Sequence, residues 1–431
     1  MNDQVRLEKI VALAKRRGFI YPSSEIYGGL ANVYDYGPLG VELKNNIKNL
    51  WWQKFVHQRQ DIVGLDSSIL MNPKIWEASG HIANFTDPLI ECKSCHSRFR
   101  ADQVSADFNS LPCPNCDKQD GYFPAQQFNL MFKTKIGATQ KEETDIYLRP
   151  ETAQAIFANF KNVVETTRIN LPFGIAQIGK AFRNEITTGY FIFRMLEFEQ
   201  MEIEYFIQEE NWEKAFEQWQ DKILNWAQSI GLQKANIRFR QHDDKERSHY
   251  SKKTVDLEYN FSGDYKEIYG LAYRGDYDLA AHQKHSGIDL SVDGKLPHVI
   301  EPSFGVDRTV LSILLDSYYQ DEKRVVLKLK PKLAPYKVAV FPLVANKEEL
   351  VMKARSVFEL INKAEINCAW DDRGNIGKRY LSQDEIGTPF CLTIDYTTLE
   401  DDTITVRFRD DMQQERVNIG KILEFIENKI D

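Results

Sequence analysis

Two period-two segments joined by a short connection constrain the fold of this chain more than any other feature. They cover residues 175–183 and 194–206, and apolar and polar residues alternate along both. Such alternation is typical of strands with one buried face. The connection over 186–191 contains Thr187 and Thr188, so the sequence predicts an antiparallel hairpin. We therefore expect a sheet built around this hairpin.

The second strand of the hairpin is unusually rich in glutamate. Strands are depleted in glutamate, and a conflict of this kind between local preference and structure tends to fall at a functional site. Four glutamates occur within eight residues, namely Glu197, Glu199, Glu202 and Glu204.

Period-two geometry also predicts which side chains share a face of the hairpin. Arg183 and Glu185 fall together on one strand, and Phe198, Gln200 and Glu202 fall together on the other. An arginine can bind phosphate bidentately, a carboxylate can accept from an adenine amino group, and a phenyl ring can stack on a base. The face therefore has the groups that a nucleotide needs, while a solvated face with surface ion pairs is the alternative.

A predicted strand-to-helix junction near residue 300 repeats this combination of charges. Glu301 lies in a predicted strand, and a helix is expected over 305–318 with Arg308 on its first turn. A cationic side chain beside free backbone N–H groups suits a polyphosphate. Glu267 and Glu301 are candidate ligands for Mg²⁺, which takes one or two carboxylates together with phosphate oxygens.

Four of the six cysteines form two CxxC pairs, which are separated by 17 residues. This spacing matches a structural zinc ribbon in a small insertion over residues 90–120. Four unligated buried cysteines and the remains of a former zinc site are the alternatives, and His96 is a weaker candidate for one ligand position. The four sulfur ligands would be Cys92, Cys95, Cys113 and Cys116.

The 431 residues suffice for two to three domains. The sequence pattern changes near 329–332, which indicates a domain boundary. Beyond it, predicted strands and helices alternate, which predicts an α/β module of about 100 residues. No apolar run reaches the roughly 20 residues of a membrane helix, and the N-terminus carries no secretory signal, so we expect a cytoplasmic protein without a membrane partner.

The net charge of −8 argues against a broad nucleic-acid-wrapping surface but not against local basic clusters. The basic residues that could meet RNA near the domain boundary and beyond it are Lys323, Arg324, Lys328, Lys330, Lys332, Lys378 and Arg379.

Together these segments resemble class II aminoacyl-tRNA synthetases. Phe182-Arg183-Asn184-Glu185 resembles their motif 2, Gly305-Val306-Asp307-Arg308 their motif 3, and the long predicted helix from about Pro38 their dimerisation motif 1. The stretches 148–154 (LRPETAQ), 197–202 (EFEQME) and 301–303 (EPS) are characteristic of the glycyl-tRNA synthetases of single-chain homodimeric type.

The resemblance spans nearly the whole chain and implies an α+β fold. A catalytic domain over 1–330 would hold an antiparallel sheet flanked by helices, with the Cys-rich insertion at about 90–120, and an α/β anticodon-binding domain would cover 334–431. The implied activity is two-step: ATP and glycine form glycyl-adenylate with release of pyrophosphate, and the glycyl group then passes to the 3′-terminal ribose of tRNA(Gly). ATP with Mg²⁺, a possible structural Zn²⁺ and a second copy of the chain are the further implied partners.

The resemblance also implies roles for individual residues. The residues near the amino acid would be Arg100, Glu151, Phe198, Glu199, Gln200, Met201, Glu202, Glu301, Pro302, Ser303, Phe304 and Gly305. Those near ATP would be Arg183, Asn184, Glu185, Phe193, Arg194, Met195, Leu196, Glu197, Phe198, Glu267, Ile268, Gly305, Val306, Asp307 and Arg308. Family members often carry polar residues at the positions of Met195 and Leu196, so backbone contacts to ATP are expected there.

Two alternatives remain open on the sequence. A class II synthetase for another amino acid, such as threonine or proline, would share motifs 2 and 3 but should lack the 149–152 (RPET) and 199–202 (EQME) stretches that this chain has. A synthetase-like nucleic-acid-binding factor without catalytic activity should have lost Arg183, Glu185 or Arg308, and all three are present.

Overall fold

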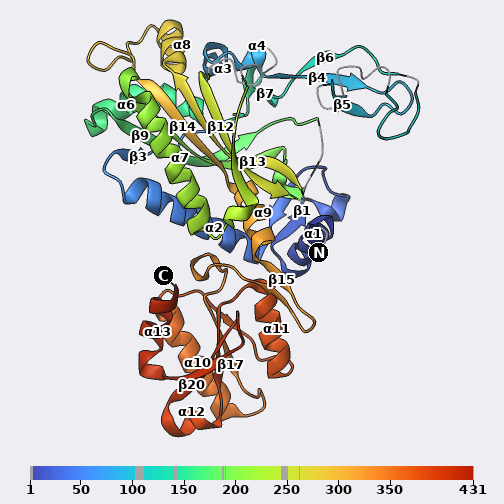
Figure 1. The fold of residues 1–431 in the computed structure, drawn as a ribbon, viewed down its shortest axis with the longest axis vertical. Coiled ribbons are helices and arrows are strands. Elements are labelled where there is room, and N and C mark those ends of the chain that lie inside the picture. Colours follow the sequence, from blue (N-terminus) through green and yellow to red (C-terminus); the bar gives the residue numbers. More distant parts are fainter. Residues whose placement is uncertain are drawn as a thin grey trace.

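A computed structural model of the chain describes residues 3–101, 111–119, 121–139, 143–186, 189, 191–243, 251–261 and 263–430. They form a large N-terminal part around a seven-stranded sheet and a smaller C-terminal part around a five-stranded sheet (Figure 1). The expected α+β fold is confirmed. The turn residues Thr187 and Thr188, and residues 102–110 of the insertion, lie outside the described residues.

The seven-stranded sheet is antiparallel except at one edge, where β3 runs parallel to β9. The expected hairpin is β9 and β10, which pair from Glu197 opposite Phe182 to Phe206 opposite Phe173. The second strand begins three residues later than expected because the chain first forms a turn of 3-10 helix, η4 (Phe191–Phe193). In spatial order the strands are β11 (Ile237–Gln241), β12 (Lys253–Phe261), β13 (Asp264–Gly275), β14 (His298–Gly305), β10 (Glu197–Ile207), β9 (Phe173–Phe182) and β3 (Ile62–Gly64).

Alternation along β10 directs its side chains into two different environments. Met201 and Ile203 enter the main apolar core, whereas Phe206 packs in a second core on the other face. Glu202 and Glu204 are buried on the same face as Phe206, in a part of it where the neighbouring side chains are polar. The main core is covered by α1 (Asp3–Arg17), α2 (Pro38–Trp52), the π-helical turn η2 (Gln53–His57), α7 (Trp212–Ser229) and α9 (Val306–Ser317), and the second by α6 (Ala153–Thr167) and α8 (Tyr277–Ser286).

The sequence also predicts short strands throughout 235–300, and this prediction is wrong. The region contains the long strands β12 and β13, followed by the unexpected helix α8. Along β12, Val255 and Leu257 enter the main core, while Asp256 and Glu258 are buried on the other face. Arginines on β11 neutralise Glu258, which allows a strand to bury charged residues that the sequence pattern assigns to solvent.

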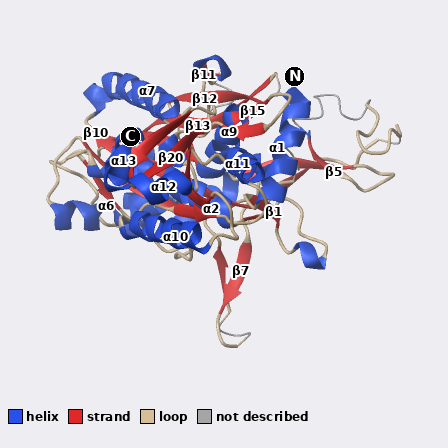
Figure 2. Cartoon of the chain, turned by 90° about the horizontal axis from the view of Figure 1, so that it is seen from below, coloured by secondary structure: helices blue, strands red, loops and turns tan. Residues whose placement is uncertain are grey.

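The remaining N-terminal elements surround the main sheet. The insertion contains a three-stranded sheet in the order β5-β4-β6, and the hairpin of β7 and β8 extends away from the body of the molecule (Figure 2). Their bounds are β4 (Thr86–Glu91), β5 (Arg98–Arg100), β6 (Gln126–Asn129), β7 (Lys133–Ile136) and β8 (Thr144–Tyr147). The shorter elements are β1 (Ile20–Pro22), η1 (Glu25–Tyr27), β2 (Tyr34–Tyr36), α3 (Lys74–Ala78), α4 (His81–Asn84), η5 (Glu209–Asn211), η6 (Lys234–Asn236), β15 (Tyr318–Gln320), β16 (Val325–Leu327) and η7 (Pro331–Leu333).

The C-terminal part is a five-stranded sheet in the order β18-β17-β19-β20-β21, with a core of its own. Strand β17 runs parallel to β18 and β19, whereas β19, β20 and β21 are antiparallel. The expected alternation of strands and helices is present, together with α12 and β21, which the sequence analysis missed. The elements are β17 (Val338–Pro342), α10 (Glu348–Lys363), β18 (Cys368–Trp370), α11 (Ile376–Ile386), β19 (Phe390–Ile394), α12 (Tyr396–Asp401), β20 (Thr403–Phe408), β21 (Gln414–Asn418), η8 (Ile419–Lys421) and α13 (Ile422–Ile430).

Two basic residues that were expected to meet RNA are instead buried at structural junctions. The Arg324 guanidinium lies 2.8 Å from Asp384 and donates to the Arg409 carbonyl, which ties β15 and β16 to the C-terminal part. Arg379 donates to four backbone carbonyls around the start of α11. Both arginines are therefore structural, whereas Lys323, Lys328, Lys330 and Lys378 of the predicted clusters are exposed.

Within the described ranges, no helix combines the length and the apolar character that crossing a bilayer requires.

Candidate active site

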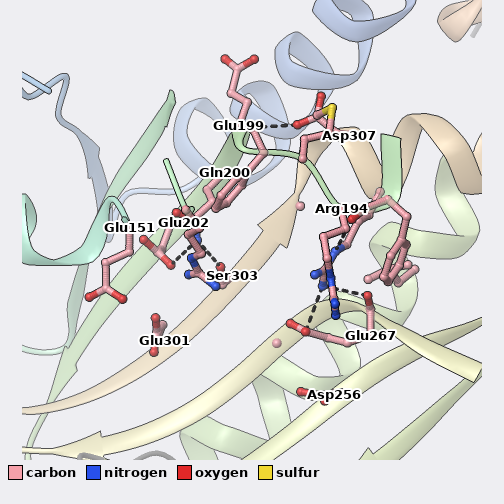
Figure 3. Close-up of a pocket in the computed structure, with 18 of the residues that line it drawn as sticks. Glu151, Arg194, Glu199, Gln200, Glu202, Asp256, Glu267, Glu301, Ser303 and Asp307 are labelled. Carbon is pink, nitrogen blue, oxygen red and sulfur yellow. Dashed lines mark hydrogen bonds and ion pairs between the residues drawn. The ribbon is translucent and has the colours of Figure 1, made fainter. Parts of the chain in front are cut away.

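A cavity of about 260 Å³ opens on the polar face of the seven-stranded sheet (Figure 3). Its walls come from β10, β12, β13 and β14, from the segments before α6 and after β9, and from the first turn of α9. Most of the residues that the sequence singled out line it: Glu151, Arg183, Glu185, Phe193, Arg194, Met195, Phe198, Glu199, Gln200, Glu202, Glu267, Ile268, Glu301, Ser303, Gly305, Asp307 and Arg308.

The other expected site residues, all of which the structure describes, do not line the cavity. Met201 and Phe304 point to the opposite face of the sheet and are buried in the main core, as period-two geometry requires. Arg100 lies in the insertion, 2.8 Å from Asp87. The residues in this group are Arg100, Asn184, Leu196, Glu197, Met201, Pro302, Phe304 and Val306.

One end of the cavity is acidic and almost completely buried. Glu151, Glu202 and Glu301 are each at most 9% exposed, and Ser303 lies beside them (Figure 3). The Glu301 carboxylate lies 2.8 Å from Arg274, whose other nitrogens hold Asp278. This end therefore contains more carboxyl groups than cationic side chains.

Burial and neighbouring charges shift the pKa values of these carboxyls in opposite directions. Burial opposes ionisation of Glu151, but His81 and Arg274 hold its pKa well below the usual value. Burial and the Glu151 charge raise the pKa of Glu202. Burial raises the pKa of Glu301 to about 8, although Arg274 opposes the shift. Carboxyls with such divergent pKa values in one cavity are typical of a functional site.

The middle of the cavity is formed by arginine and aromatic rings. The Arg183 guanidinium lies between the rings of Phe85 and Phe198, at 5.4 and 5.3 Å from their centroids, and its Nε donates to the Pro150 carbonyl. These contacts hold the guanidinium in place at the cavity wall.

The end opposite the acidic one is built from β12, β13 and α9. Arg308 donates to both the backbone carbonyl and the side-chain carboxylate of Glu267, each at 2.9 Å, and stacks over Phe193. His242 Nε2 lies 2.6 Å from Asp256 in the same region. Burial and the Glu267 charge raise the pKa of Asp256 to about 6.

Glu267 and Glu301 do not converge on one point. They lie at opposite ends of the cavity in Figure 3, and each faces a different arginine. Glu301 instead groups with Glu202 and Glu204, and one oxygen of each lies within 4.8 Å of the other two. One Mg²⁺ held jointly by Glu267 and Glu301 is therefore not supported by this geometry.

Glu199 points away from Glu202 and Ser303, toward the helices behind the sheet (Figure 3). Its carboxylate lies 2.9 Å from Lys44 and 3.0 Å from Lys48, both on α2. Its backbone N–H donates to the Asp307 carboxylate at 2.8 Å. Glu199 thus supports the cavity from behind.

The four clustered cysteines converge, as expected. The Cys95 and Cys113 sulfurs lie 3.6 Å apart and the Cys92 and Cys116 sulfurs 3.9 Å apart. Ligands about 2.3 Å from a tetrahedral zinc ion would be about 3.8 Å apart, so the arrangement fits zinc. The fifth candidate, His96, is instead paired with Glu91 at 2.8 Å.

Several groups that support the site were not expected from the sequence. His81 lies 3.3 Å from Glu151, and Arg274 and Asp278 form a buried pair behind Glu301. The sequence signal for such a pair is an arginine at the end of a strand and an aspartate four residues later. This signal can be recognised only if residues 264–275 are predicted as one strand. Asp256 and His242 also line the cavity without having been expected there.

Comparisons with known proteins agree with this architecture. Residues 132–318 match the family model described as the tRNA synthetase class II core domain (G, H, P, S and T), and residues 337–429 match the one described as the anticodon binding domain. The first match contains most of the cavity, and the second covers the five-stranded sheet.

Curated relatives match the chain over its whole length. The glycine–tRNA ligases of Caldanaerobacter subterraneus subsp. tengcongensis and Clostridium kluyveri are 48% and 49% identical, over 100% of both chains in each case. The glycine–tRNA ligase of Thermobifida fusca is 49% identical over 98% of both chains. A crystal structure of the prolyl-tRNA synthetase from Cryptosporidium parvum, complexed with L-proline and AMP, has the same fold: its TM-score is 0.64 at 16% identity, over 98% of this chain and 78% of that one.

Proposed function

This chain belongs to the glycine–tRNA ligase family of class II aminoacyl-tRNA synthetases, and from that membership we propose how its cavity works. The enzyme attaches glycine to tRNA(Gly). Glycine and ATP first form glycyl-adenylate, and the glycyl group is then transferred to the 3′-terminal ribose of the tRNA. The observation that carries the residue-level account is the division of one cavity into a buried acidic end and an arginine-rich end.

The acidic end suits the amino acid. Glycine offers only an ammonium and a carboxylate, so a selective pocket must bind the ammonium tightly and leave no space at the α-carbon. We assign the amino-acid contacts to Glu151, Glu202 and Ser303, whose side chains are held by His81, Thr152 and the neighbouring strand. A hydrophobic pocket that distinguishes one methyl group gains only about 1–3 kcal/mol, whereas rigid, paired glutamates exclude the alanine methyl more strongly.

The remainder of the cavity suits ATP. We assign the α-phosphate to Arg183, the adenine to Glu185 and the Phe198 ring, and the distal phosphates to Arg308. Arg183 is already clamped between two rings, so its guanidinium is oriented before the nucleotide arrives.

Catalysis then requires no side-chain nucleophile. A glycine carboxylate oxygen attacks the α-phosphorus, and the bond from that phosphorus to the pyrophosphate oxygen breaks. In the second step the tRNA ribose hydroxyl oxygen attacks the carbonyl carbon, the bond from that carbon to the adenylate phosphate oxygen breaks, and AMP leaves as its phosphate takes up the hydroxyl proton. Arg183 and Arg308 position the phosphates and neutralise the charge that develops on them. Glu267 would hold Mg²⁺ at the phosphate end, and the ion would supply further positive charge for the phosphates of ATP.

Charging of tRNA(Gly) with radiolabelled glycine tests this account. Purified enzyme should charge tRNA(Gly) with glycine and not with alanine, and charging should depend on ATP. Efficient charging with alanine would contradict the proposed pocket, because its walls are proposed to exclude the methyl group.

We propose the division of the chain into a catalytic domain over 1–330 and an anticodon-binding domain over 334–431. The separate core of the five-stranded sheet and the family match over 337–429 support this boundary. The exposed lysines near the boundary, including Lys328 and Lys330, would contact the tRNA backbone.

We also propose that the Cys-rich insertion holds one structural Zn²⁺. Four sulfurs in tetrahedral spacing leave no open coordination position, so the ion would stabilise the insertion rather than take part in the reaction. The same four thiols favour the reducing cytoplasm, where translation takes place, as the location of the enzyme.

A homodimer is the proposed assembly. Ile26 and Tyr27 are each 87% exposed on the turn between β1 and β2, and Leu30 is 60% exposed nearby. Exposed apolar side chains that form a contiguous patch mark protein-binding surfaces. We propose that these three form one, and a second copy is the occupant that the resemblance to homodimeric synthetases implies. Light scattering should give twice the 50.1 kDa chain mass. A monomeric mass for the wild-type enzyme would contradict the proposal.

A further inference from the structure

Helix α11 belongs to the C-terminal part of the chain, but its last turn packs against the N-terminal part. The helix lies next to α1 and β16 (Figure 1). Its earlier residues Ile376 and Tyr380 pack against the five-stranded sheet, whereas Ile386 is 7% exposed and enters the main apolar core of the N-terminal part. One helix therefore contributes side chains to both cores.

Glu385, directly before Ile386, is held by two arginines from the last turn of α1. The Arg16 guanidinium donates to both oxygens of the Glu385 carboxylate, at 2.9 and 3.2 Å, and the Arg17 guanidinium donates to the same carboxylate. Arg17 also donates to the Ser382 hydroxyl at 3.2 Å. The Glu385 side chain is only 17% exposed. A bidentate pair of this kind fixes direction as well as distance.

The residues around Glu385 are attached to the N-terminal part as well. Asp384 has no exposed surface and accepts from Arg324, in the connection between β15 and β16, at 2.8 Å. Arg409, which follows β20, donates to the Leu329 carbonyl at 2.8 Å. Buried polar contacts cannot be broken without cost, so this region resists rotation. We call residues 382–387 the α11 joint.

On the N-terminal side the α11 joint is connected to the cavity through two helices. Helix α1 carries Arg16 and Arg17 in its last turn, and its Arg6 donates to the Leu315 carbonyl in the last turn of α9. The first turn of α9 carries Arg308, which lines the cavity. A continuous series of packed elements therefore fixes the C-terminal part relative to the cavity.

We propose that Glu385 is a positioning residue for the transfer of glycine to tRNA, because the α11 joint sets the place of the anticodon-binding part relative to the cavity. The inference rests on the proposed function, in which one tRNA contacts both parts at once. Two linked contacts support each other only when the geometry allows both to form together.

The two steps of the reaction depend on the joint to different extents. The anticodon and the 3′ end lie at opposite ends of a tRNA, so a small rotation at the α11 joint displaces the 3′ end at the cavity. Misplacement of a reacting group lowers its rate strongly. ATP and glycine reach the cavity without the C-terminal part, so adenylate formation should not depend on the joint.

The test reverses the charge of Glu385 and compares two RNA substrates. E385R sets a third guanidinium against Arg16 and Arg17, so the α11 joint should loosen. The kcat/KM for charging full-length tRNA(Gly) should fall at least about five-fold. A minihelix that has only the acceptor stem and the 3′ end should be charged within about two-fold of the wild-type value, because it does not reach the C-terminal part. ATP–pyrophosphate exchange should stay at the wild-type rate.

Two further variants control for the change of charge itself. E359R makes the same substitution at an exposed position of α10, whose neighbours are elements of the C-terminal part. This control should charge both RNAs as the wild type does. R16E/R17E/E385R restores the attraction between α1 and α11 with the signs exchanged, so it should recover most of the charging that E385R loses.

The outcomes separate the α11 joint from the function on which it rests. Wild-type charging of full-length tRNA(Gly) by E385R, or an equal loss of full-length charging, minihelix charging and exchange, would overturn the proposal. If E385R does not fold, E385Q removes the charge without adding repulsion and should show the same difference between the two RNAs at a smaller size. Wild-type enzyme that charges the minihelix as efficiently as full-length tRNA(Gly) would instead refute the anticodon-binding role of the C-terminal part.

Discussion

The Lys44 ammonium lies 3.1 Å from the Asp307 carboxylate, which connects α2 to the first turn of α9. The same ammonium lies 2.9 Å from Glu199 on β10, and the Tyr36 hydroxyl donates to Asp307 at 2.6 Å. Glu199 follows Phe198 and Asp307 precedes Arg308 in the chain. Lys44 therefore ties the segment proposed to bind adenine to the segment proposed to bind the distal phosphates.

Replacing Lys44 should impair ATP use more than glycine use. K44M leaves Glu199 and Asp307 without their shared cation, so the spacing between Phe198 and Arg308 is no longer fixed. We expect the KM for ATP in pyrophosphate exchange to rise about ten-fold, corresponding to about 1.4 kcal/mol, and the KM for glycine to stay nearly constant.

The control for this prediction is K48M. Lys48 binds the same Glu199 carboxylate but is more exposed than Lys44, at 24% against 13% for the side chain. In the described part of the chain Lys48 forms no ion pair with Asp307. K48M should therefore have the smaller effect. Equal effects of the two variants, or equal changes in the two KM values, would contradict a role of Lys44 in linking the two segments.

Replacing Arg183 should slow adenylate formation without abolishing glycine binding. R183A removes the guanidinium proposed to neutralise charge at the α-phosphate, and loss of one such group costs about 10²–10³ in rate. Single-turnover formation of adenylate should show this loss, while glycine affinity measured by calorimetry should change little. Wild-type exchange activity in R183A would show that the assignment is wrong.

The buried Asp256 should make the stability of the protein depend on pH. Its pKa is raised from 3.8 to about 6, so the folded protein binds this proton more tightly than the unfolded chain does. The protonated Asp256 carboxyl therefore adds to the free energy of unfolding at low pH, and this contribution is lost as the pH rises through about 6. Relative to D256N, the wild-type free energy of unfolding should fall by about 2 kcal/mol between about pH 4.5 and about pH 7.5.

Urea unfolding of the two proteins across this range is the appropriate measurement. Asparagine keeps an oxygen acceptor for His242 but does not titrate, so the difference between the two curves isolates the Asp256 carboxyl. A difference that stays constant with pH would show that the pKa of Asp256 is not raised in the folded protein.

The cysteine cluster should contain one zinc ion per chain. C113S removes one of the four ligands, so metal content measured by mass spectrometry should fall and the insertion should become more sensitive to protease. C391S is the control, because Cys391 lies in the core of the C-terminal part, away from the cluster. Equal metal content in wild type and C113S would contradict a four-cysteine zinc site.

Local patterns predicted the central hairpin and the edges of the cavity well. Period-two alternation located β9 and β10, and it also explains why Phe198, Gln200 and Glu202 face the cavity while Met201 enters the core. The junction before Arg308 was also predicted as a strand followed by a helix, although the strand runs directly into the helix: β14 ends at Gly305 and α9 begins at Val306.

Features that depend on contacts between distant segments could not be predicted in this way. Arg324 has the sequence character of a surface residue, but its partner Asp384 lies 60 positions away and brings it into the interior. Glu267 and Glu301 both lie in strands, yet the order of the strands places them at opposite ends of the cavity. Strand order and long-range charge pairs are set by the whole fold, which local pattern does not encode.

ATP–pyrophosphate exchange across the twenty standard amino acids tests the central claim most directly. The account predicts exchange that depends on glycine, with alanine and all larger amino acids inactive because the walls of the acidic pocket exclude a side chain. Exchange supported by another amino acid at a rate comparable to that with glycine, or no exchange with any of them, would contradict it.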